Sequence, residues 1–79
     1  MFDKEAETVR IAVQALGAES DPDLLRALEE EQSAAATGLE YYGITKTVFE
    51  RLLERRDLKP STRTALKKAI KAVVKMYTQ

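Results

Sequence analysis

The sequence predicts an all-α protein, a compact orthogonal bundle of four to five short helices in a single domain over residues 1–79. Three observations predict this class. Apolar residues recur at helical spacing along most of the chain, and neither an alternating run nor an Asn-Gly or Asp-Gly turn indicates a strand. Glycine, proline and serine separate the periodic segments at short intervals. A chain of 79 residues has room for one modest core.

The acidic first part of the chain is predicted to form two helices. Asp3 is a suitable N-cap for the first, and Gly17 can end it in the left-handed conformation, which a residue without a Cβ adopts at little cost. Ser20 or Asp21 can cap the second helix, and Pro22 suits its first turn. The buried stripes consist of small and aliphatic residues: Ala6, Val9, Ala12, Val13 and Leu16 in the first helix, and Leu24, Leu25 and Leu28 in the second.

The stretch 29–37 has two interpretations. In one, the helix breaks near Ser33, which then caps a new helix that starts at Ala34. In the other, a single helix runs from Pro22 to Tyr42, because the three consecutive alanines in this stretch favour helix strongly. We favour the break.

Gly43 is predicted to end the next helix, and Thr45 to cap the one that follows it. That helix buries Val48, Phe49, Leu52 and Leu53. Pro60 stops it, because proline disfavours the α conformation of the residue before it, and Ser61 caps the final helix. The final helix has an apolar stripe of Ala65, Leu66, Ala69, Ile70, Val73, Val74 and Tyr77, and a basic face of Arg63, Lys67, Lys68, Lys71 and Lys75.

The composition excludes most catalytic chemistry. The chain has no cysteine and no histidine, so it lacks thiolates, the commonest general base and the commonest metal ligand. We therefore expect no enzymatic activity, no cofactor and no metal site. The first residues are acidic and no apolar run of about 18 residues occurs, which predicts a cytoplasmic protein without a signal peptide or membrane span.

The charges are distributed unevenly although the net charge is zero. Residues 1–40 hold ten acids and three bases, a charge of −7, whereas residues 41–79 hold three acids and ten bases, a charge of +7. Such asymmetry suggests a basic functional face. Alternatively, the two halves attract each other within the fold or across a dimer. Both interpretations stay open at the level of sequence.

The junction Gly43-Ile44-Thr45 has the pattern of a helix-turn-helix. Such a unit needs a glycine at its sharp turn, and Gly43 supplies one. Ile44 is the apolar residue that fills the angle, Thr45 caps the second helix, and Phe49 and Leu52 occupy the two buried positions that follow. An ordinary corner between two helices would use similar residues.

Residues 33–75 resemble the lambda-repressor-like helix-turn-helix domains, a scheme shared by lactose-repressor headpieces and the small antidote proteins of addiction modules. Besides the junction, the resemblance rests on a basic turn at Arg55-Arg56, a helix start at Lys59-Pro60-Ser61 and a following helix rich in leucine and alanine. One departure is Leu39, which stands where the family usually has alanine.

The resemblance implies a small transcriptional regulator that binds double-stranded DNA as a homodimer, with a recognition helix at about residues 45–56. The residues facing base edges would be Thr45, Lys46, Thr47, Glu50 and Arg51, with Arg51 on guanine; those gripping phosphates would be Arg55, Arg56, Lys59, Ser61 and Arg63.

The alternative is a non-enzymatic protein-interaction module, a small adaptor or inhibitor that docks through its acidic N-terminal half (residues 1–32) or a surface at Tyr41 and Tyr42. Under this hypothesis, residues 33–79 hold no recognition unit and the lysines of the last helix are a solvated face.

Overall fold

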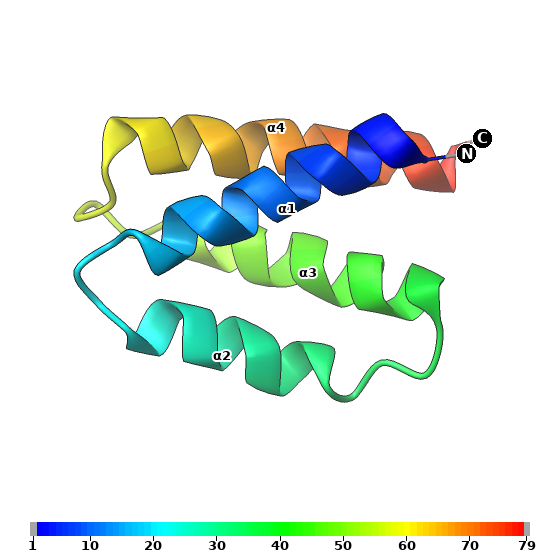
Figure 1. Ribbon diagram of the computed structural model, residues 1–79, viewed down its shortest axis with the longest axis horizontal. Helices are drawn as coiled ribbons and strands as arrows, with labels where there is room; N and C mark the ends of the chain where they lie inside the picture. The colour runs from blue at the N-terminus through cyan, green and yellow to red at the C-terminus, as the bar shows by residue number, and fades with distance from the viewer. Residues whose placement is uncertain (1, 79) are drawn as a thin grey trace.

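The computed structural model describes residues 2–78. Within them the chain forms four helices and no strand: α1 (Asp3–Gly17), α2 (Asp23–Gln32), α3 (Gly38–Leu52) and α4 (Pro60–Tyr77). The chain passes back and forth along the long axis, so that each helix runs opposite to the one before it and both chain ends lie at the same end of the bundle (Figure 1). The all-α class is confirmed, but the bundle is antiparallel rather than orthogonal.

The four helices form a ring in which each contacts its two neighbours. The contact between α1 and α4 is the most extensive, and the contact between α1 and α2 the least. Across the diagonals, α1 with α3 and α2 with α4, no Cα atoms of residues 2–78 come within 8 Å of one another. None of the four helices is long and apolar enough to cross a membrane.

All four helices contribute to one core, and its centre consists of fully buried large side chains: Leu16, Leu28, Phe49, Leu66 and Val73. The predicted stripes are confirmed at these positions, because helical spacing places them on the inner faces. Two core residues fall outside the predicted stripes: Met76 near the end of α4, and Leu58 in the connection between α3 and α4.

The first connection is held by side chains rather than by glycine. Gly17 is the last residue of α1 and has an ordinary helical backbone, since no glycine of residues 2–78 has a positive φ. The left-handed termination predicted there is therefore wrong, and so is the cap at Asp3, because Phe2 occupies the cap position. Asp21 does support the start of α2, where its Oδ1 accepts a hydrogen bond of 3.0 Å from the Asp23 N–H.

The predicted break near Ser33 is confirmed, but the restart at Ala34 is wrong. Ser33 is the C-cap of α2, and its hydroxyl donates a hydrogen bond of 2.6 Å back to the Glu30 carbonyl; it does not cap the next helix. The next helix starts at Gly38 because Thr37 accepts a hydrogen bond of 3.1 Å from the Glu40 N–H. Threonine followed three residues later by glutamate is a capping-box signature, and it prevails over the helix propensity of the alanines before it.

The predicted turn at Gly43 is absent. Helix α3 runs without a break from Gly38 to Leu52, so the helix predicted from residue 45 to 56 begins seven residues earlier and ends four residues earlier. Helix α4 likewise starts one residue before the predicted cap at Ser61, with Lys59 as N-cap and Pro60 in the first turn, where its missing N–H costs nothing.

Candidate interaction surfaces

Thr45 lies inside the bundle instead of at the exposed start of a recognition helix. Its side chain is fully buried. The hydroxyl donates a hydrogen bond of 2.7 Å to the Tyr41 carbonyl one turn earlier and accepts one of 2.9 Å from Gln32 Nε2 on α2. Thr45 therefore ties α2 to α3 and cannot face a base edge, so its predicted role is wrong.

Gly43 has a packing role in the middle of α3. A Cβ at this position would overlap the hydroxyl of Tyr77, which reaches over from the end of α4 and donates a hydrogen bond to the Leu39 carbonyl. The glycine thus permits a close approach of a tyrosine side chain to a helix backbone, a need that a sequence does not distinguish from a turn.

The remaining predicted base-contacting residues on α3 bond within the fold. Lys46 Nζ lies 3.1 Å from Glu50 Oε2, and Arg51 forms an ion pair with Glu31 of α2. Thr47 is exposed, and its hydroxyl donates to a carbonyl one turn earlier at 3.1 Å. Because Arg51 is paired with Glu31, the guanine contact that the resemblance implies would require this exposed ion pair to break.

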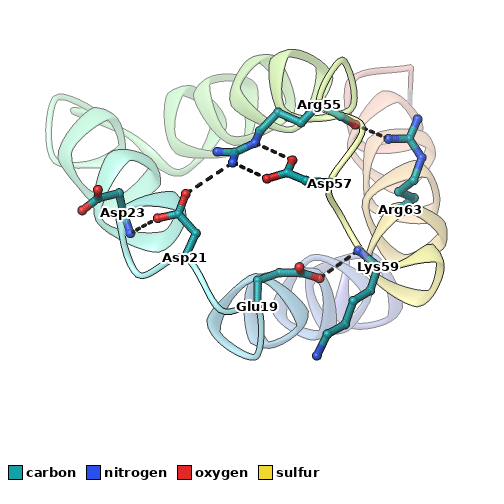
Figure 2. A network of polar contacts seen from close by, with 7 residues as sticks. All are labelled: Glu19, Asp21, Asp23, Arg55, Asp57, Lys59 and Arg63. Atoms are coloured by element: carbon teal, nitrogen blue, oxygen red, sulfur yellow. Dashed lines mark hydrogen bonds and ion pairs between the residues drawn. The ribbon is translucent and has the colours of Figure 1, made fainter.

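Arg55 lies at the centre of a polar network at the end of the bundle where α1 connects to α2 and α3 connects to α4 (Figure 2). Its guanidinium makes hydrogen bonds of 3.0 and 2.7 Å to the two carboxylate oxygens of Asp57 and one of 3.3 Å to Asp21. These hydrogen bonds lower the pKa of Asp57, and they raise the pKa of Arg55. Arg63 donates a hydrogen bond of 2.6 Å to the Arg55 carbonyl.

Glu19 extends this network to the start of α4. Its Oε2 accepts a hydrogen bond of 3.2 Å from the Lys59 N–H and another from the buried Thr62 hydroxyl. Lys59 Nζ bonds the Ala18 carbonyl at 3.4 Å. We call this set the loop clamp: Glu19, Asp21, Arg55, Asp57, Lys59, Thr62 and Arg63. It joins the two connections at one end of the bundle and supplies the carboxylate that caps α4.

The predicted phosphate-gripping residues are therefore divided. Arg55, Lys59 and Arg63 belong to the loop clamp, whereas Arg56 and Ser61 are exposed and make no side-chain hydrogen bond or ion pair within residues 2–78. The structure does not bring the ten predicted residues together on one basic face.

The uneven charge of the sequence becomes a charge separation in space. Helix α2 holds four acids and one base, and α4 holds five bases and no acid. These two helices lie on a diagonal of the bundle, with no Cα atom of one within 8 Å of a Cα atom of the other. Opposite charges from the two halves do meet where Arg55 pairs with Asp21 and where Arg51 pairs with Glu31, as expected if the halves attract each other within the fold.

The outer face of α4, which we call the lysine face, consists of Lys67, Lys68, Lys71 and Lys75. All four side chains are exposed, and none lies within 4.0 Å of a carboxylate oxygen of residues 2–78. Open grooves run along both sides of this face, one against α1 and one against α3.

A different groove, which we call the tyrosine groove, separates α1 from the beginning of α3. Its volume is about 400 Å³, and it is lined by apolar, aromatic and charged residues: Asp3, Ala6, Glu7, Val9, Arg10, Val13, Tyr41 and Tyr42. The two tyrosine rings meet edge to face with centroids 5.3 Å apart. Both tyrosines are half-buried, and neither hydroxyl is hydrogen-bonded to another of residues 2–78.

No family model, curated protein or solved structure matches this chain. The lambda-repressor-like resemblance thus stays a prediction from sequence. The lysine face and the tyrosine groove are the features from which a function can be proposed.

Two of the side chains that join separate elements could not be identified from the sequence. Glu19, in the connection between α1 and α2, bonds Thr62 of α4, and Gln32 of α2 bonds Thr45 of α3. Neither carried a local signal, because each partner is more than ten residues away. Thr37 with Glu40 did carry one, the capping box, and it would have located the start of α3.

Proposed function

We propose that the chain is a non-enzymatic protein-interaction module that holds a partner's segment in the tyrosine groove. The observation that carries this proposal is the pair of half-buried tyrosines, in edge-to-face contact, at a groove of about 400 Å³. Tyrosine is enriched at interface hot spots because it offers a large apolar face together with a hydroxyl that bonds a partner.

The walls of the groove suit an apolar anchor. Ala6, Val9 and Val13 line it from α1, opposite the aromatic rings of Tyr41 and Tyr42. A leucine or phenylalanine of a partner would exchange water for apolar contact there, while the unpartnered tyrosine hydroxyls bond the partner's backbone.

The charges around the groove select the partner. Two of the groove's lining residues are acids, Asp3 and Glu7, and one is a base, Arg10, which gives the lining a charge of −1. At the rim, Arg10 is paired with Glu7 through its Nε at 2.9 Å, so the one base of the lining is already engaged by a carboxylate. We therefore expect a segment with apolar anchors flanked by lysine or arginine.

DNA binding through residues 45–56 is not part of this proposal. Thr45 is buried, and the guanidinium groups of Arg51 and Arg55 are held by carboxylates.

A random peptide library displayed on phage, selected on the intact chain, tests the proposal without a known partner. We expect enriched peptides with apolar anchors and basic flanks, which bind Tyr41→Ala at least about tenfold more weakly. Tyr41 is the better target, because Tyr42 also packs against the core.

Lys71→Ser, on the opposite side of the molecule, is the control and should bind the same peptides with unchanged affinity. The proposal fails if no peptide family is enriched, or if the enriched peptides bind wild type and Tyr41→Ala equally.

A further inference from the structure

Two grooves join into one along the outer seam between α1 and α4. The larger has a volume of about 600 Å³ and the smaller about 320 Å³, and they share Thr8 and Lys68. The seam is on the other side of α1 from the tyrosine groove: its α1 residues are Lys4, Glu5, Thr8 and Ile11, none of which lines that groove.

The floor of the seam is apolar and small. Ala65 and Ala72 line it from α4, and Thr8 and Ile11 line it from α1. Ile11 has 49% of its surface exposed, one of the large apolar side chains left open to water. Small residues on closely packed helices leave a channel, and an exposed isoleucine in that channel would gain from being covered.

The rim of the seam is strongly basic. Four lysines line the larger groove, Lys4, Lys68, Lys71 and Lys75, against the single acid Glu5. None of the four lysines forms an ion pair within residues 2–78. The spacing of Lys71 and Lys75 is four residues, at which like charges on a helix repel each other.

We propose that the seam binds one acidic amphipathic helix of a partner protein. The lining residues run from Ser61 to Lys75 of α4, a span of about 21 Å at 1.5 Å per residue, which matches a helix of about 14 residues. An apolar stripe on that helix covers Ile11 and the alanines, and its flanking glutamates pair with the lysines.

An acidic amphipathic helix would contact both the apolar floor and the basic rim of the seam, whereas the phosphate backbone of a nucleic acid would suit the rim alone. Phosphates would pair with the lysines but would leave Ile11 against charged oxygens. The occupant also differs from the one proposed for the tyrosine groove, because that groove lies among acidic residues and selects a basic segment. The two sites are therefore independent in position and opposite in charge preference.

Fluorescence polarisation with a labelled synthetic peptide tests the inference. The probe is an amphipathic helix of about 18 residues with leucine at helical spacing and glutamate elsewhere. A scrambled peptide of equal composition and a labelled DNA duplex are the comparison probes. We expect only the amphipathic peptide to bind with high affinity.

Adjacent lysines provide matched variants with the same change in net charge. Lys68 lines both parts of the seam, whereas Lys67 lies on the α3 side of α4. We expect Lys68→Glu and Ile11→Ser to weaken the peptide about tenfold each, and Lys67→Glu to weaken it less than threefold. All three positions are exposed, and matching circular dichroism spectra would verify their folding.

Several results would overturn the inference: no binding of the acidic peptide, equal binding of the scrambled peptide, or equal weakening by Lys67→Glu and Lys68→Glu. Tighter binding of the duplex, insensitive to Ile11→Ser, would instead assign the lysines to nucleic acid. Tyr41→Ala should leave the affinity for the acidic peptide unchanged. The hypothesis for the tyrosine groove and the hypothesis for the seam can therefore fail separately.

Discussion

The cations that attach α4 to the bundle and those on its lysine face come from the same basic half of the sequence, but they have different surroundings. Arg55 and Lys59 bond groups of the α1–α2 connection. Lys68 and Lys71, which follow in α4, have no carboxylate oxygen of residues 2–78 within 4.0 Å. A basic residue is structural where the fold brings an acid beside it and available to a partner where it does not.

The largest effect should come from the carboxylate that caps α4. Glu19→Ala removes the acceptor for both the Lys59 N–H and the buried Thr62 hydroxyl. Hydrogen bonds to a charged group contribute about 1.5–3 kcal/mol, so we expect a loss of about 2 kcal/mol in the free energy of unfolding, measured with urea.

Glu19→Gln is the matched variant, because it keeps an uncharged acceptor and should lose only part of this stability. If the Glu19→Ala protein were as stable as wild type, α4 would be held without the loop clamp. The cations of the clamp would then be no more structural than those of the lysine face.

Arg55→Ala should lower the urea midpoint less than Glu19→Ala, since the Arg55 side chain is 37% exposed and water screens its ion pairs. The effect should depend on pH. The pKa of Asp57 is below its ordinary value of 3.8 in the folded protein, so the pair stabilises the fold above that value and ceases to do so as the carboxylate is protonated at lower pH.

Urea titrations of wild type and Arg55→Ala at neutral pH and well below pH 3.8 would check this sign. We expect a difference between the midpoints at neutral pH that narrows in acid. A difference that grows in acid would contradict the pairing with Asp57.

The far end of α4 is attached by Tyr77, and Gly43 provides the test. In wild type, Gly43→Ala gains helix propensity of about 1 kcal/mol but displaces the Tyr77 hydroxyl from the Leu39 carbonyl. In a Tyr77→Phe background no hydroxyl is displaced, and we expect the full gain of about 1 kcal/mol. The two gains, measured by thermal or urea unfolding, should therefore differ.

The same two measurements show whether Gly43 lies within a helix or in a turn. If Gly43 stood in a left-handed turn, alanine would destabilise the chain in both backgrounds. Equal gains in both backgrounds would show that Tyr77 does not rest on this residue.

The fold was more predictable than the surfaces. Periodicity located the stripes that contain Leu16, Leu28 and Leu66, because burial repeats with the helical turn. Periodicity cannot tell a turn glycine from Gly43, whose neighbour Tyr77 lies more than thirty residues away. The tyrosine groove was anticipated at Tyr41 and Tyr42, but its α1 wall depends on how two diagonal helices diverge, which no local pattern encodes.

The smallest effects should have opposite signs at a lysine of the lysine face and at Arg51, a cation that an acid of another helix pairs. Lys71 lies three or four residues from Lys67, Lys68 and Lys75, so Lys71→Glu exchanges three repulsions for three attractions, each about 0.2–0.5 kcal/mol, and should raise stability slightly. Arg51→Glu makes the same change in net charge but places two carboxylates together, because Arg51 is paired with Glu31. We expect it to lower stability by about 0.5–1 kcal/mol.

Urea unfolding at low and high salt measures both, and salt should shrink both differences, because these side chains are exposed. If both variants shifted stability in the same direction, net charge rather than local pairing would govern the fold, and the lysine face would lose its distinction from the cations that hold the bundle together.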